Sequence, residues 1–119
     1  MSLTIYHNPR CSKSRETLKL LQNSGVEHAV IEYLREPPTA ERILQLASLL
    51  GVAVAELLRR GEDNFKNAQD LPDIDDEKAL AAWIAQNPTV LQRPIVVDDH
   101  ANRAVVGRPP ENVLELTGQ

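Results

Sequence analysis

The chain has a single cysteine, Cys11, and the residues around it are polar and mostly basic. Arg10 precedes it, and Lys13 and Arg15 follow within about one helical turn. Nearby positive charge lowers the pKa of a thiol and favours the thiolate, which is the nucleophilic form. A free cysteine can also be a buried, inert, small apolar residue. Charged neighbours make such enclosure difficult, so we expect Cys11 to be a reactive nucleophile.

The local pattern places Cys11 at the beginning of a helix. Residues 3–7 alternate as a strand does, a turn-forming Asn-Pro-Arg stands at 8–10, and residues 12–24 are helix-like. The first N–H groups of a helix have no partner within it and favour negative charge. They would stabilise a Cys11 thiolate, and they could also hold an oxyanion.

Two other polar residues lie near Cys11 along the chain. His7 ends the expected strand, and Ser14 comes one helical turn after Cys11. Each could orient or hydrogen-bond the sulfur or its adduct. Each could equally be structural, as a strand-end histidine and as a first-turn serine that satisfies backbone donors. Neither residue assigns a function by itself.

The order of the remaining segments predicts an α/β fold. A second strand at 28–34 follows the first helix, and strand-helix-strand order favours a parallel pair. β-branched runs at 95–97 and 104–106 indicate a hairpin, and a short final helix begins at 109–110. We therefore expect a small mixed sheet, ordered β-α-β, helical insertion, β-β-α, and covered by helices.

The helical insertion is expected to hold three helices, recognised by apolar residues at helical spacing. They are one that begins after Thr39, a short one at about 54–60, and one that carries Leu80, Trp83 and Ile84 and stops near 87–88.

Length and composition limit the classes of function. The 119 residues suffice for one core, so we expect one domain over 1–119. A net charge of −4 disfavours nucleic-acid partners, and the chain lacks both an apolar run of membrane-spanning length and a signal peptide, so we expect a cytoplasmic protein. One cysteine and three scattered histidines predict no metal, no bound cofactor and no internal disulfide.

The segment 7–15, His-Asn-Pro-Arg-Cys-Ser-Lys-Ser-Arg, resembles the active-site segment of the ArsC-type arsenate reductases, which are glutaredoxin-coupled enzymes with a thioredoxin-like fold. Nearly the whole chain resembles this family. It differs from the well-characterised arsenate reductases in two ways, a stretch from Arg93 to Arg108 that is longer by a few residues and a shorter C-terminus, so it looks closer to a short branch of the family. The later matching blocks are Glu32-Tyr33-Leu34 with Pro37-Pro38, Leu57-Leu58-Arg59, Arg93-Pro94-Ile95-Val96-Val97 and Gly107-Arg108-Pro109-Pro110.

The resemblance implies a role for each matching residue of the site. Several guanidinium groups around a thiolate would lower its pKa and neutralise a multiply charged oxyanion. The matches are Cys11 as catalytic nucleophile, Arg59, Arg93 and Arg108 as substrate-binding residues, and His7 and Ser14 as supporting residues.

Two details of these assignments depend on neighbouring residues. Arg59 is preferred to Arg60 because it directly follows the two leucines of the motif, whereas Arg60 would point elsewhere on the expected helix. Arg93 precedes Pro94, and thioredoxin folds place a cis-proline beside the active cysteine, although the isomer cannot be read from a sequence.

The implied activity is reduction of arsenate to arsenite, with glutathione as co-substrate and glutaredoxin as partner. Arsenate reduction takes two electrons, and a lone cysteine cannot form the disulfide that supplies them, so an external thiol must enter each cycle. Two alternatives stay open, namely a Spx-type regulator that binds RNA polymerase and another glutathione-linked thiol oxidoreductase. Spx-type regulators often have Cys-x-x-Cys, where this chain has Ser14.

Overall fold

The computed structural model describes residues 2–118, which form two compact units. One, here called the sheet unit, contains residues 2–36 and 93–118, and the other, the helical unit, contains residues 37–92. All the residues predicted for the site lie in the sheet unit, except Arg59. A single domain over 1–119 stays a prediction.

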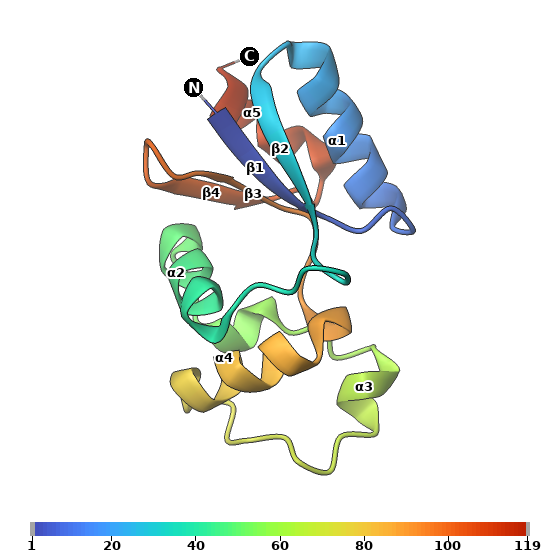
Figure 1. Cartoon of the computed structure of the whole chain (residues 1–119), viewed down its shortest axis with the longest axis vertical. Coiled ribbons are helices and arrows are strands. Elements are labelled where there is room, and N and C mark those ends of the chain that lie inside the picture. The colour runs from blue at the N-terminus through green and yellow to red at the C-terminus, as the bar shows by residue number, and fades with distance from the viewer. Residues whose placement is uncertain (1, 119) are drawn as a thin grey trace. The chain divides into compact units, whose positions relative to one another are not determined.

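The sheet unit is built on a four-stranded mixed sheet in the order β2-β1-β3-β4 (Figure 1). β1 pairs with β2 in parallel, and β3 pairs with both β1 and β4 antiparallel, which confirms the predicted parallel pair and hairpin. The strands are β1 (Ser2–His7), β2 (Glu27–Glu32), β3 (Ile95–Asp98) and β4 (Arg103–Val106).

The second strand ends two residues earlier than its sequence pattern predicts. Its last residue is Glu32, whose carbonyl oxygen accepts the N–H groups of both Arg35 and Glu36 at 2.9 Å. These bonds turn the chain, so Leu34 stands in a loop and is 39% exposed. Because Tyr33 and Leu34 are also apolar, the sequence pattern does not distinguish the end of the strand from the start of the loop.

Helices cover one face of this sheet. α1 (Ser12–Ser24) has the predicted bounds and ends at Gly25, whose φ of 73° suits a glycine. A 3₁₀ helix η3 (Pro110–Val113) and α5 (Leu114–Thr117) follow β4 and pack against α1. The core between helices and sheet is formed by Leu3, Ile5, Leu21, Val96, Val113 and Leu116.

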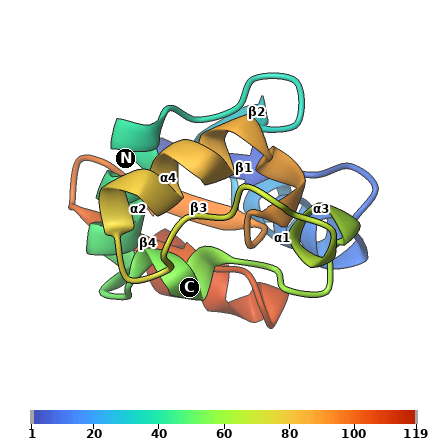
Figure 2. The same ribbon diagram turned by 90° about the horizontal axis from the view of Figure 1, so that it is seen from below.

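The helical unit packs α2 (Ala40–Leu50) against α4 (Glu77–Gln86), as Figure 2 shows from below. Thr39 caps α2 as predicted, because its hydroxyl accepts the Arg42 N–H at 3.1 Å. The smaller elements are the 3₁₀ helices η1 (Val54–Leu57) and η2 (Pro88–Val90) and the four-residue α3 (Asp63–Lys66). No helix within residues 2–118 is long and apolar enough to cross a membrane.

The predicted helix at 54–60 is wrong beyond Leu57. Leu58 is extended and forms an isolated antiparallel bridge with Leu91. The Arg59 N–H donates to the Val90 carbonyl at 2.6 Å, and the Gln92 N–H donates to the Leu57 carbonyl at 2.7 Å. The backbone conformation of residues 57–59 therefore depends on bonds to residues more than thirty positions away in the sequence. The local spacing of apolar residues does not predict such bonds.

Candidate active site

A tight turn between β1 and α1 fixes the position of Cys11. The Cys11 N–H donates to the Asn8 carbonyl at 3.0 Å, and the Asn8 side-chain oxygen accepts the Arg10 N–H at 3.0 Å. Cys11 is the extended N-cap residue of α1, and its carbonyl accepts the Arg15 N–H at 3.0 Å. The prediction that Cys11 begins the helix is confirmed.

Positive charge and backbone donors surround the partly exposed Cys11 sulfur. Burial raises the pKa of this thiol, but the Ser14 N–H, a hydrogen bond from the Arg93 side chain, the charge of Arg108 and the Lys13 N–H together lower it below its ordinary value. Arg108 Nη2 lies 3.3 Å from the sulfur. Both N–H groups belong to the first turn of α1, where unpaired backbone donors favour negative charge.

The hairpin of β3 and β4 brings both of these arginines to Cys11. Ile95 at the start of β3 pairs with Val106 at the end of β4, so Arg93 and Arg108 leave the same end of the hairpin. Arg108 Nε donates to the Arg93 carbonyl at 2.7 Å, which fixes the guanidinium between Arg93 and the sulfur. The bonds Arg93-Pro94 and Arg108-Pro109 are both cis.

Gly107 allows the segment before Arg108 to lie directly against α1. A Cβ at this position would overlap the Thr17 hydroxyl and stand 2.8 Å from Pro94 Cγ. The Gly107 N–H donates to the Pro94 carbonyl at 2.9 Å. Only a residue without a side chain fits here, and this close approach sets where Arg108 begins.

His7 and Ser14 hold the turn rather than the sulfur. The Ser14 hydroxyl accepts the Asn8 N–H at 3.0 Å and lies 2.7 Å from His7 Nδ1, and both side chains are buried. Burial lowers the pKa of His7, the Glu32 carboxylate raises it, and Arg15 lowers it further; the net direction is downward, so the imidazole is neutral near pH 7. Within residues 2–118, neither side chain hydrogen-bonds to the Cys11 sulfur.

Arg59 belongs to the helical unit and is held by contacts there. Its Nη1 donates to the Gln92 side-chain oxygen at 3.2 Å, and its Nε lies 3.6 Å from a Glu62 carboxylate oxygen. Arg60 instead places its guanidinium 5.9 Å from the centre of the Phe65 ring. The expectation that both arginines lie on one helix and point in different directions is wrong about the helix, which ends at Leu57. The two side chains nevertheless have different surroundings.

The sequence matches a known family model over residues 6–116, and that model is the ArsC family. The chain belongs to the ArsC family. It is 47% identical over 115 residues to the uncharacterized protein YfgD of Escherichia coli, covering 96% of this chain and 95% of that one. It is also 38% identical to an arsenate reductase of Haemophilus influenzae, covering 98% and 99% of the two chains. A solved arsenate reductase from Vibrio cholerae superposes with a TM-score of 0.83, at 43% identity and 97% coverage of each chain.

This ArsC-family membership, together with the mixed four-stranded sheet, confirms the predicted α/β fold of thioredoxin type. The structure brings Cys11, Arg93 and Arg108 together. His7 and Ser14 contact each other, and Ser14 hydrogen-bonds to the turn at Asn8. Within residues 2–118, no group of three or more His, Cys, Asp or Glu side chains is arranged to hold a metal ion.

Three residues that position this ArsC-family site were not singled out from the sequence for that role. Asn8 closes the turn with its side chain and backbone. Thr17 packs against Gly107, and Asn112 donates to the Val106 and Arg108 carbonyls at 3.0 and 3.2 Å. The Asn-Pro dipeptide was a turn signal for Asn8, whereas no local pattern pointed to Thr17 or Asn112.

Proposed function

We propose that this chain is an arsenate reductase that uses Cys11 as nucleophile, glutathione as co-substrate and glutaredoxin as partner. The supporting observation is the partly exposed sulfur with Arg108 Nη2 at 3.3 Å and a pKa below its ordinary value. Arsenate reductases of Haemophilus influenzae and Vibrio cholerae are relatives over nearly the full chain. A cycle that consumes reduced glutathione also favours the cytoplasm, where that pool is maintained.

The first step is attack on arsenate by the Cys11 thiolate. Arsenate is multiply charged near neutral pH, and the guanidinium groups of Arg93 and Arg108 offset that charge beside the sulfur. The N–H groups at the start of α1 offer further donors to arsenate oxygens. A sulfur–arsenic bond forms as one oxygen leaves as water, and arsenic stays As(V).

Arg59 is proposed as the third substrate-binding arginine. Its support is its place directly after Leu57-Leu58, as in the family motif, and its partly exposed side chain. Its hydrogen bond to Gln92 and its ion pair with Glu62 leave part of its five-donor fork available for an oxyanion.

The reducing electrons come from two external thiols. Glutathione displaces a second oxygen as water and forms a Cys11–arsenic–glutathione adduct. The glutaredoxin thiolate then attacks the glutathione sulfur, so a mixed disulfide forms, the sulfur–arsenic bond breaks, and its electron pair reduces As(V) to As(III). Hydrolysis of the remaining sulfur–arsenic bond releases arsenite and returns the Cys11 thiol.

An arsenite-release assay with the purified protein tests this proposal. We expect release from the complete mixture, and loss of release when glutathione, glutaredoxin or arsenate is omitted in turn. Cys11→Ser should be inactive under all conditions, while Ser12→Ala, a change at an exposed neighbour, should be active. Arsenite release without any external thiol, or by the Cys11→Ser variant, would contradict the mechanism.

A further inference from the structure

A pocket of about 340 Å³ is lined in part by the turn that precedes Cys11. It lies entirely within the sheet unit, and its walls come from the β1–α1 turn and the end of β2 with the loop after it. The function proposed above does not use it. The lining residues are His7, Asn8, Pro9, Arg10, Glu32, Leu34 and Arg35.

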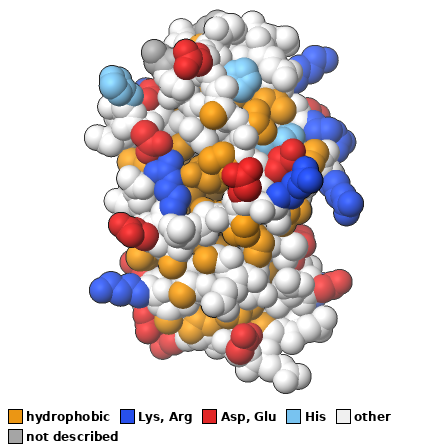
Figure 3. All heavy atoms as spheres, in the orientation of Figure 1, with side chains coloured by type: hydrophobic (Ala, Val, Ile, Leu, Met, Phe, Trp, Pro, Cys, Tyr) orange, Lys and Arg blue, Asp and Glu red, His pale blue; other side chains and the backbone are white. Residues whose placement is uncertain are grey.

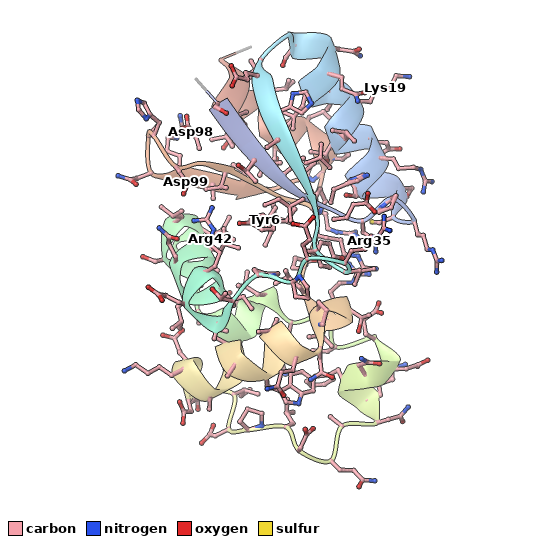
Figure 4. All side chains as sticks on the ribbon, viewed as in Figure 1. Tyr6, Lys19, Arg35, Arg42, Asp98 and Asp99 are labelled. Atoms are coloured by element: carbon pink, nitrogen blue, oxygen red, sulfur yellow. The ribbon has the colours of Figure 1, made fainter. Side chains whose placement is uncertain are left out.

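The charges of this pocket form a distinct pattern. Arg10 and Arg35 are exposed, and within residues 2–118 neither guanidinium has a hydrogen-bond or ion-pair partner. Glu32, at the end of β2, adds one partly buried acidic residue. Figure 4 shows Arg35 in the loop that follows β2, and Figure 3 shows basic side chains gathered on that side of the visible face. Two cations and one anion line a single pocket.

One residue that lines the pocket, Arg10, is the sequence neighbour of Cys11. Arg10 is bonded directly to Cys11, which sets their Cα atoms about 3.8 Å apart. The turn is fixed by the Cys11 N–H bond to the Asn8 carbonyl at 3.0 Å, and Asn8 also lines the pocket. A molecule whose sulfur reaches Cys11 could therefore extend its ends over this turn.

We propose that this pocket binds the charged ends of the thiol co-substrate, with Arg10 and Arg35 on its carboxylates and Glu32 on its ammonium group. Glutathione carries two carboxylates and one ammonium group, which is the complement of the pocket's charges. Leu34 provides an apolar wall for the uncharged part. This inference rests on the proposed use of glutathione, and it adds the residues that select an acidic thiol over a neutral one.

The test uses thiol–disulfide exchange at Cys11, which needs no arsenate. The Cys11 thiolate attacks one sulfur of a disulfide, a mixed disulfide forms, and the other half leaves as a thiolate. Glutathione disulfide serves as the charged probe and 2-hydroxyethyl disulfide as the neutral one. The quantity measured is the rate with glutathione disulfide divided by the rate with 2-hydroxyethyl disulfide, both followed by intact mass at one pH. Any change in the thiolate fraction affects both rates equally and cancels in this ratio.

We expect Arg35→Ala and Arg10→Ala each to lower this ratio about two- to fivefold, because exposed ion pairs are individually weak. The preference should also fall with added salt in the wild type. The matched control is Lys13→Gln, which removes an equal charge two residues from Cys11 outside the pocket, and it should leave the ratio unchanged.

Two results would overturn the inference. One is an unchanged ratio in both arginine variants. The other is an equal decrease in Lys13→Gln, which would assign the preference to the general field of the basic residues. Because arsenate is absent, a chain that fails to release arsenite could still show the preference, so the two proposals fail separately.

Discussion

The reactivity of this chain depends on a small number of side chains around one sulfur. Burial works against the Cys11 thiolate, and two backbone N–H groups, Arg93 and Arg108 outweigh it. Arg108 is the best positioned of these, because its Nε is tied to the Arg93 carbonyl while its Nη2 reaches the sulfur. Removal of either arginine should therefore change the thiol itself as well as oxyanion binding.

The pH dependence of Cys11 alkylation should reveal the lowered pKa. Because the thiolate is the reactive form, the rate should reach half its maximum at a pH below about 8.5, the value for a free cysteine. Arg108→Ala should shift this midpoint upward, and Arg108→Lys should shift it less. Arg103→Ala, at an exposed position on β4, is the matched control. A wild-type midpoint at the free-cysteine value would contradict the account.

Loss of the Ser14 hydroxyl should destabilise the turn. Ser14→Ala leaves the buried Asn8 N–H and His7 Nδ1 without this partner, which should lower the free energy of unfolding by about 1–3 kcal/mol. Urea unfolding measures the change, and Ser12→Ala on the exposed side of the same helical turn should cost much less. Equal effects of the two substitutions would show that the hydroxyl has no special structural role.

At the level of elements, the site depends on how closely the end of β4 approaches α1. The β3–β4 hairpin supplies both arginines from one end, and α1 supplies Cys11 at its N-cap. Gly107 is the point of contact, because its missing side chain leaves room for Thr17 and Pro94.

Gly107→Ala should disturb this contact and the sulfur together. The added methyl group would overlap the Thr17 hydroxyl and Pro94, and overpacking of this kind costs about 1–3 kcal/mol of unfolding free energy. Displacement of Arg108 should also raise the pKa of Cys11. Gly61→Ala is the control, because a Cβ there meets nothing within 4 Å. A stable Gly107→Ala variant with an unchanged alkylation profile would refute the role of this contact.

Sequence patterns predicted an element well where the signals for its start and end lie in the same segment. α1 has the predicted bounds, because it is marked by a turn before it and Gly25 after it. The error at 54–60 arose because residues 57–59 pair with residues 90–92, a long-range choice without a local signal. The same limit applies to the site: the resemblance indicated Arg93 and Arg108, but only the folded hairpin explains their meeting at Cys11.

At the level of the whole chain, the substrate-binding proposal draws on both units. Arg93 and Arg108 belong to the sheet unit with Cys11, and Arg59 belongs to the helical unit. If all three act on one oxyanion, loss of any one of them weakens its binding in solution.

Alanine substitution of Arg59, Arg93 or Arg108 should weaken oxyanion binding. Charge-assisted hydrogen bonds contribute about 1.5–3 kcal/mol each, so each loss should weaken binding roughly ten- to hundredfold. Calorimetry with sulfate, phosphate or arsenate measures the effect. Lysine variants should recover only part of it, because lysine lacks the bidentate fork.

The control for this series is Arg60→Ala. This residue neighbours Arg59, but its guanidinium lies over the Phe65 ring, so its removal should leave oxyanion binding unchanged. If all three variants bind oxyanions as the wild type does, the shared oxyanion site is refuted. An effect of Arg60→Ala equal to that of Arg59→Ala would remove the case for Arg59 alone.

The most direct test of the central claim is the intact mass of the protein after incubation with arsenate and glutathione in the absence of glutaredoxin. The mechanism predicts a species heavier by one arsenic centre and one glutathione, located on the peptide that contains Cys11, which disappears with arsenite release when glutaredoxin is added. A glutathione adduct without arsenic, or an arsenic adduct on any other residue, would contradict the assignment of Cys11 as the nucleophile that attacks arsenate.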